Sequence, residues 1–222
     1  RLLSSAASDV YKRQVNGPFE ARVNDWGAKI EPTNGFKAKQ RLRRYQEIIE
    51  KDTDMCLGSY CFLWGQKQES TSTWHGMYLS NGNPTEAVDV MHYCWKGYWP
   101  EKRAPSIQEI FLNGESWKAN HEFNERDVIE LSYVVDKYNN EKVYLNFEIY
   151  PETFSTQQGG DFQKSPEKID FKIINESNNK LVLEAPRKNG AYRIFVFAKN
   201  DYNQYSVANI LSLIHISEPT RR

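Results

Sequence analysis

Residues 185–197 read Ala-Pro-Arg-Lys-Asn-Gly-Ala-Tyr-Arg-Ile-Phe-Val-Phe, and this stretch decides the fold of the second half of the chain. A turn signal at Ala185-Pro186 is followed by Tyr192, which directly precedes a run of β-branched and aromatic residues. In β-sandwiches a tyrosine at this place often bonds back to the backbone a few residues upstream, which is the motif called a tyrosine corner. The stretch therefore predicts a strand of an antiparallel β-sandwich.

Alternating runs of the same kind extend in both directions from this strand. Asn-Gly, Asn-Asn and Gly-Gly turn signals separate them. The predicted strands are Ile107–Leu112, Val128–Val135, Val143–Tyr150, Ile169–Ile174, Leu181–Glu184, Tyr192–Ala198 and Tyr205–Ile210. Together they predict an all-β, immunoglobulin-like sandwich over residues 107–210, preceded by a linker at 100–106 where prolines and mixed charge break the periodicity.

The first half of the chain has a different pattern. Apolar residues at roughly helical spacing predict an amphipathic helix between Pro32 and Asp52. Its basic residues favour a solvated face, with a phosphate-binding face as the less favoured alternative; they are Lys37, Lys39, Arg41, Arg43 and Arg44. Thr85 caps a second helix with an apolar stripe at Ala87, Met91, Cys94 and Trp95.

Between these helices the segment Cys56–Leu63 is short, apolar and rich in β-formers, which predicts a strand covered on both faces. A helix followed by such a strand indicates an α/β layer. Cys56 and Cys61 would point to opposite faces of that strand, so we expect no disulfide between them.

Composition narrows the class of protein. Lys+Arg and Asp+Glu both number 29, so the chain is formally neutral and shows no sign of a nucleic-acid partner or an anionic membrane surface. No apolar run is long enough for a membrane span. Although the mean hydropathy is only −0.74, the aromatic content of 14% argues against disorder.

The polar segment after Leu63 is the candidate site, because functional groups of α/β folds lie on loops that follow strands. Its candidate substrate-binding residues are Trp64, Gln66, Lys67, Glu69 and Trp74. An indole offers an apolar platform for the C–H face of a sugar ring, while amide, ammonium and carboxylate groups bond its hydroxyls. The alternative is that Trp64 packs in a core and the polar run is a solvated loop.

Catalytic and cofactor signals are weak. Glu69 has no second carboxylate at a spacing that glycoside hydrolysis requires, so we interpret it as a binding or salt-bridging residue. The histidines have no metal-ligand spacing, and nucleotide and dinucleotide fingerprints are absent from the sequence. We therefore expect no metal site and no cofactor.

The two ends of the chain encode an inverted DNA repeat. Back-translation of residues 9–14 gives a DNA sequence whose reverse complement encodes residues 211–216. Such paired ends are typical of a translated sequencing adaptor and not of a protein segment. We expect residues 1–14 and 211–222 to be adaptor-derived.

Several motifs resemble the C-terminal part of bacterial glycoside hydrolases related to family 2. They are Asn16-Gly-Pro-Phe-Glu20, Trp26-Gly-Ala-Lys-Ile-Glu-Pro32, Leu57-Gly-Ser-Tyr60, Phe62-Leu-Trp-Gly-Gln-Lys-Gln-Glu69, Thr73-Trp74, Lys102-Arg-Ala-Pro105, Gly190-Ala-Tyr-Arg-Ile-Phe195 and Ala208-Asn-Ile210. The resemblance implies that residues 15–99 are the truncated end of a TIM barrel, with Trp64 as the floor of a substrate subsite.

The same resemblance implies a parent enzyme that hydrolyses β-linked glycosides with a retaining pair of carboxylates. Its nucleophile is expected upstream of Val15, so no catalytic residue is retained and the fragment is expected to be inactive. Its partner would be an oligo- or polysaccharide, and its location periplasmic or extracellular. The alternative is a non-catalytic β-sandwich module that binds carbohydrate or protein, with a structural N-terminal region.

Overall fold

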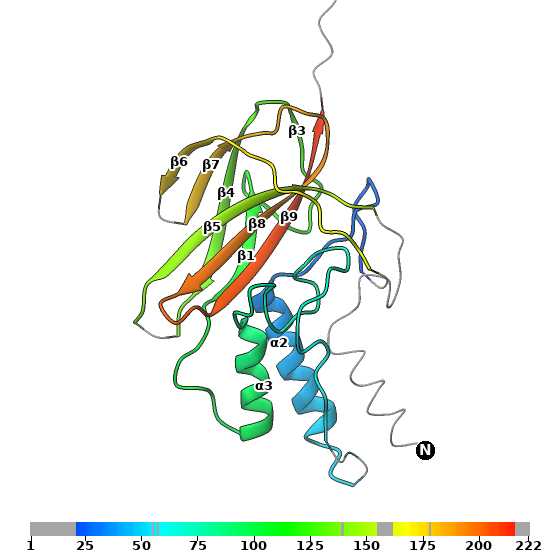
Figure 1. Cartoon of the computed structure of the whole chain (residues 1–222), viewed down its shortest axis with the longest axis vertical. Helices are drawn as coiled ribbons and strands as arrows, with labels where there is room; N and C mark the ends of the chain where they lie inside the picture. Colours follow the sequence, from blue (N-terminus) through cyan, green and yellow to red (C-terminus); the bar gives the residue numbers. More distant parts are fainter. Residues whose placement is uncertain are drawn as a thin grey trace, which may run out of the picture.

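The computed structural model describes residues 21–54, 56, 58–138, 140–154, 162–177 and 179–215. A β-sandwich forms one end of the molecule and two helices form the other (Figure 1). The helices are α2 (Asn34–Arg44), which continues into a π-helical turn η1 (Tyr45–Ile49), and α3 (Glu86–Lys96).

Two mainly antiparallel sheets form the sandwich. The first has the order β2 (Glu115–Ser116), β1 (Ser106–Leu112), β4 (Val128–Asp136), β7 (Lys180–Glu184) and β6 (Ile173–Ser177). The second has the order β3 (Glu122–Asn124), β9 (Tyr205–His215), β8 (Gly190–Asn200) and β5 (Val143–Pro151). The predicted β-sandwich is confirmed and its two sheets are consistent with the predicted immunoglobulin-like arrangement, although β6 begins four residues later than predicted and the short strands β2 and β3 carried no recognised signal.

The predicted tyrosine corner is present. The Tyr192 hydroxyl donates a hydrogen bond of 2.9 Å to the carbonyl oxygen of Lys188, four residues upstream. The ring is buried with 5% of its surface exposed, and β8 continues from it in register with both β5 and β9. The corner thus fixes the start of the central strand of the second sheet.

Alternate residues of the strands fill one core between the two sheets. Its fully buried side chains include Ile107, Ile110, Leu112, Ile129, Leu131, Ile149, Leu181, Leu183 and Ile194. A smaller apolar cluster joins the helices, with Ala38 of α2 and Met77, Val90 and Met91 at its centre. The helical end therefore has little core of its own.

Both helices begin at threonine caps, of which Thr85 was predicted. The Thr33 hydroxyl accepts from the Phe36 amide at 3.2 Å, and the Thr85 hydroxyl accepts from the Ala87 amide at 3.4 Å. The interpretation of the basic run as a solvated face is wrong for two of its members, because Lys37 and Arg41 are 5% and 3% exposed. They are buried because α2 packs on β1 and on residues 71–76 as well as on α3.

The predicted strand at Cys56–Leu63 is wrong. The described residues of this segment form no strand. At its end, the Met77 amide donates a hydrogen bond of 3.1 Å to the Leu63 carbonyl. A strand is stable only beside a partner that pairs its backbone groups. Across the described residues from 21 to 99 we find helices and isolated bridges but no strand, so no barrel segment is formed there.

Residues 1–14 and 216–222, which the sequence assigns to an adaptor, lie outside the described residues. The remaining part of the second segment, residues 211–215, belongs to β9, and Leu211 and Ile214 are buried in the sandwich core. Residues 211–214 extend β9 by pairing with residues 190–193 of β8. In the described part of the chain, no helix is long and apolar enough to cross a membrane.

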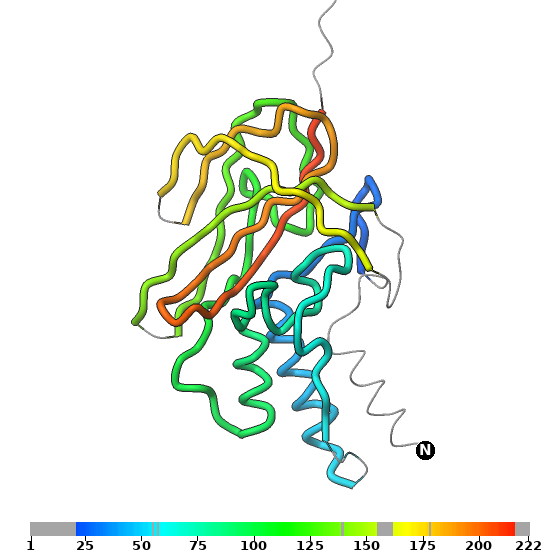
Figure 2. The backbone as a smooth tube through the Cα atoms, viewed as in Figure 1, coloured from blue at the N-terminus to red at the C-terminus, as the bar shows by residue number. Residues whose placement is uncertain are grey.

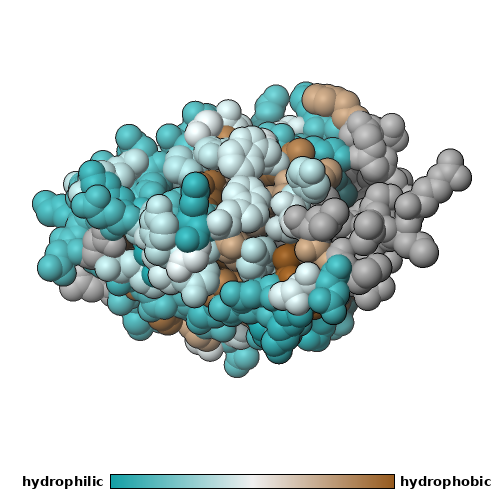
Figure 3. Space-filling view, turned by 90° about the horizontal axis from the view of Figure 1, so that it is seen from below, coloured by the Kyte–Doolittle hydropathy of each residue, from teal (hydrophilic) through white to brown (hydrophobic). Residues whose placement is uncertain are grey.

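The helices press closely against the sandwich. A Cβ atom added at Gly35, in the first turn of α2, would lie 2.6 Å from the carbonyl oxygen of Ile107, so only glycine permits this approach. Figure 2 shows the chain between η1 and α3 returning from the far end of the helices to the sheets. Seen from the helical end, hydrophobic residues form scattered patches among hydrophilic ones and no broad apolar face (Figure 3).

A buried carboxylate, Glu86, ties α3 to both sheets. It accepts hydrogen bonds from the hydroxyl of Ser106 in β1 at 2.6 Å and from that of Ser206 in β9 at 2.8 Å. Burial raises the pKa of Glu86 to about 7, and burial also raises that of its neighbour Asp89 to about 6. The folded protein therefore holds protons on both groups at a pH where the unfolded chain has released them.

This difference predicts a pH dependence of stability. Between about pH 4.5 and pH 7 the folded state binds more protons than the unfolded state, so the free energy of unfolding falls as the pH rises through this window. Glu86→Gln removes this contribution, and relative to the wild type it should gain up to about 3 kcal/mol between pH 5 and pH 8. Guanidinium denaturation at the two pH values measures the change. A constant difference between the two proteins would contradict the prediction.

Candidate functional site

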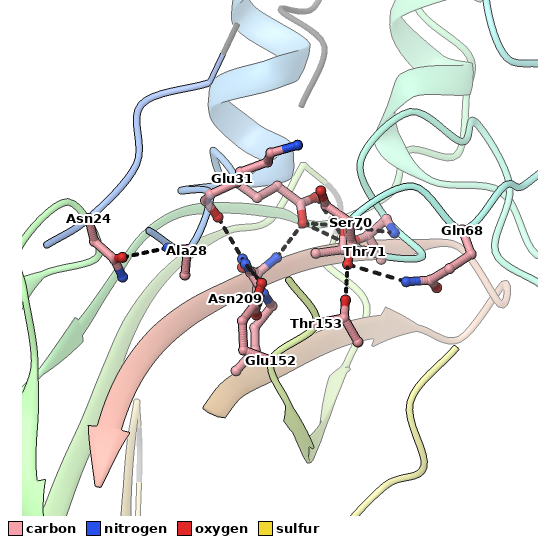
Figure 4. Close-up of polar contacts among 12 residues, drawn as sticks. Asn24, Ala28, Glu31, Gln68, Ser70, Thr71, Glu152, Thr153 and Asn209 are labelled. Carbon is pink, nitrogen blue, oxygen red and sulfur yellow. Dashed lines mark hydrogen bonds and ion pairs between the residues drawn. The ribbon is translucent and has the colours of Figure 1, made fainter. Parts of the chain in front are cut away.

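A network of buried charges lies where the N-terminal half meets the second sheet (Figure 4). At its centre is Glu31, which is 2% exposed. Its carboxylate accepts hydrogen bonds from the Lys37 ammonium at 2.7 Å, the Thr71 hydroxyl at 2.6 Å, the Thr73 hydroxyl at 3.0 Å and the Asn209 amide at 2.6 Å. These donors come from α2, from the loop before α3 and from β9.

The charge state of this network follows from its contacts. Burial alone would raise the pKa of Glu31, but Lys37, the hydrogen bond from Thr71 and the Arg193 charge together hold it below its usual value. Burial lowers the pKa of Lys37, and Glu31 opposes that shift. Because all its acceptor positions face donors, Glu31 is a structural anchor and is not free to exchange a proton with a ligand.

Arg193 extends the network along the outer face of β8. Its guanidinium forms a paired contact with Glu152, with Nε and Nη2 at 2.7 and 2.8 Å from the two carboxylate oxygens. Nη1 donates to the side-chain oxygen of Asn209 at 2.7 Å, and Nη2 also donates to the backbone carbonyl of Lys29 at 2.8 Å. Sequence reasoning missed both Glu31 and Arg193. A charged residue inside the apolar run at 192–198 was the available signal.

The polar loop forms a second cluster, nearer to solvent. The Lys67 ammonium lies 3.0 Å from Glu69 Oε2, and His75 Nε2 lies 3.9 Å from Glu69 Oε1. Burial lowers the pKa of His75, although Glu69 opposes the shift, so at neutral pH the imidazole is uncharged. Glu69 was predicted to be a binding or salt-bridging residue, and its contact with Lys67 shows the salt bridge.

Trp64 lies at the surface with 55% of its area exposed. Its ring stacks on Trp95 of α3, with centroids 6.2 Å apart and planes at 20°, and it also contacts Tyr78 at 5.7 Å. Phe62, 46% exposed, packs edge-on against His75 at 5.7 Å. We call Trp64, Tyr78 and Trp95 the Trp64 surface. The alternative that Trp64 packs in a core does not hold in this structure.

The other predicted residues lie elsewhere. Trp74 is 1% exposed and so presents no ring face to a ligand at the surface. Gln66 donates to the Ser72 carbonyl at 3.3 Å and lines a cavity against the second sheet. The structure therefore brings Lys67 and Glu69 together, places Trp64 beside α3 and separates Gln66 and Trp74 from it.

Within the described part of the chain, no group of three or more His, Cys, Asp or Glu side chains is arranged to hold a metal ion. The described cysteines Cys56, Cys61 and Cys94 are free thiols. The carboxylates that act on the charge of His75 are Glu69 and Glu31; Glu69 is paired with Lys67, and Glu31 is saturated by donors. This arrangement can bind a polar ligand, but it lacks an accessible pair of carboxylates.

No protein-family model matches the sequence, and no curated protein matches it. Solved structures similar to part of the chain include the methionine-rich copper resistance protein PcoC from Escherichia coli, at 14% identity over 50% of this chain and 99% of that protein, with a TM-score of 0.31. Murine CRIg is similar at 7% identity over 51% and 98%, with a TM-score of 0.29. A nucleoside hydrolase-related hypothetical protein from Saccharophagus degradans, associated with carbohydrate metabolism, is similar at 14% identity over 58% and 29%, with a TM-score of 0.36. Similarities this low assign no function.

The buried network predicts a large effect for one substitution. Glu31→Gln removes the carboxylate that compensates Lys37 and turns an NH2 group toward other donors, so it should lower the free energy of unfolding by about 3–5 kcal/mol. The matched control is Glu47→Gln, which breaks the exposed pair with Arg43 and should cost less than about 0.5 kcal/mol. Guanidinium denaturation compares the two variants, and equal effects would contradict the role given to Glu31.

Proposed function

We propose that this chain is the C-terminal part of a glycoside hydrolase acting on β-linked glycosides, and that Trp64 contacts sugar in the substrate site of the parent enzyme. The supporting observation is that Trp64 is 55% exposed while its ring is held by stacking on Trp95. A large aromatic ring that is fixed in place and open to solvent is typical of a binding surface.

The chemistry of the surface fits a sugar. The indole face offers an apolar platform for the C–H side of a pyranose ring. In the loop that follows Trp64 in the sequence, Lys67 offers hydrogen-bond donors and Glu69 offers acceptors for sugar hydroxyl groups. Because this ion pair is already formed, a neutral ligand does not have to bring a charge of its own.

Hydrolysis needs two carboxyl groups, one on each side of the glycosidic bond. Glu69 is engaged by Lys67 and Glu31 is buried, so neither is suited to that work. We therefore place the catalytic pair of the parent enzyme outside this chain. A periplasmic or extracellular location fits a polysaccharide substrate.

The test uses the full chain and three neutral β-1,4-linked probes, namely cellotetraose, xylotetraose and mannotetraose. At least one should change the tryptophan emission, because the exposed Trp64 indole loses contact with water on binding. Trp64→Ala should remove this response and weaken binding at this surface about tenfold. The control is Tyr98→Ala, which removes another exposed ring that contacts His92 and not Trp64.

Two results would count against the proposal. One is a Trp64→Ala variant that responds to the probes as the wild type does. The other is hydrolysis of 4-nitrophenyl β-glycosides by the purified chain, since that would require a catalytic pair among its own residues.

A further inference from the structure

A second feature of the molecule is a groove on the outer face of the second sheet, beneath residues 66–81. It consists of two cavities, of about 240 and about 400 Å³, which share Ser72, Ser80 and Tyr150 as lining residues. We call it the β5–β8 groove. Its volume is in the range of pockets that hold small ligands.

The alternation of side chains along β5 and β8 determines which residues form the floor of this groove. On β5, Tyr144, Asn146, Glu148 and Tyr150 point outward, while Phe147 and Ile149 between them fill the core. On β8 the outward residues Phe195 and Phe197 alternate with core residues in the same way. Register pairs Asn146 with Phe197 and Glu148 with Phe195, so polar and aromatic side chains lie beside each other across the strands.

The aromatic rings of the floor are fixed by one another. Phe195 and Phe197 stack with centroids 5.9 Å apart and planes at 18°, and Tyr150 packs edge-on against Phe195 at 5.5 Å. Tyr144 lies at the open end with 51% of its surface exposed. Its hydroxyl donates to Asp201 at 3.1 Å, which holds the ring in place. Phe195 is only 5% exposed and supports its neighbours, so the rings open to a ligand are those of Tyr144, Tyr150 and Phe197.

The walls are rich in amides and hydroxyls and carry little free charge. Glu152 is paired with Arg193, and Glu148 accepts from the Tyr150 hydroxyl at 2.7 Å and lies 3.7 Å from Lys168. The facing loop contributes uncharged groups, namely Gln66, Gln68, Ser70, Ser72 and Ser80. Lys199 pairs with Tyr144 across the strands, at the open end.

We infer that the β5–β8 groove binds a short neutral oligosaccharide. Aromatic platforms suit the C–H faces of sugar rings, and amides with hydroxyls both donate to and accept from sugar hydroxyls. A charged ligand would find the carboxylates already compensated. This site is additional to the Trp64 surface and independent of it, because the two share no residue.

Isothermal titration calorimetry of the full chain tests this inference with the same three tetrasaccharides. At least one should bind, and Tyr144→Ala should weaken that binding about tenfold. Tyr144 is half exposed, so its loss is compatible with folding, and circular dichroism checks this. Asn146→Ala, on the same face, is the second variant and should weaken binding in the same direction. Tyr98→Ala is the matched control and should leave affinity unchanged.

Two different measurements distinguish the two proposed carbohydrate sites. Because the groove contains no tryptophan, its binding is seen in the calorimeter and not in the Trp64 emission. Loss of affinity in Tyr144→Ala with retention in Trp64→Ala supports the groove and counts against the Trp64 surface. The reverse pattern overturns the groove and leaves the Trp64 surface standing.

Two further outcomes overturn the inference. One is the absence of calorimetric binding by the wild type for all three probes at millimolar concentration. The other is tighter binding of tetragalacturonate, an anionic oligosaccharide, than of any neutral probe, because the groove is inferred to select a neutral ligand.

Discussion

The buried carboxylate of Glu31 is the constraint on which the relation between the two halves of the molecule depends. An ionised group in the interior is tolerated only when hydrogen bonds and an opposite charge replace the water it has lost. Here those partners are supplied by Lys37 of α2, Thr71 and Thr73 of the loop, and Asn209 of β9. Helix, loop and sheet must therefore come together at one point for any of them to be stable there.

The same constraint positions the polar loop. Thr71 and Thr73 are held at Glu31, and Ser70 is held from the other side by Gln163, whose side chain accepts from its amide at 2.9 Å. From this anchor the preceding residues run back along the second sheet, where Gln66 faces the β5–β8 groove. Trp64, two residues earlier, turns toward α3 and stacks on Trp95. One short segment thus borders two surfaces, and its fixed end determines the geometry of both.

How far sequence predicts this structure depends on how local each signal is. The sandwich strands follow from alternation between turn signals, and the corner at Tyr192 follows from its place before β8, so both were predictable. The absence of a strand at 56–63 was not predictable, because an apolar run forms a strand only when a neighbouring strand exists to pair with it. Lys37 is buried because it donates to Glu31 and to the Thr73 carbonyl. The helical periodicity of the sequence does not predict such distant partners.

The predicted site residues do not all lie together in the structure, because their positions also depend on distant contacts. Trp64, Gln66 and Trp74 are close in sequence, but which of them faces solvent depends on contacts with α3 and β5 that sequence does not show. Two of the tryptophans, Trp74 and Trp117, are buried, while Trp64 and Trp95 are exposed and stacked on each other. Exposed rings that already rest on neighbours lose little side-chain freedom when a ligand arrives, so more of the contact energy is kept as affinity. The rings on the floor of the groove are held in the same way, by strand pairing and by one another. This pre-organisation distinguishes a binding surface from an exposed aromatic surface that has no ligand.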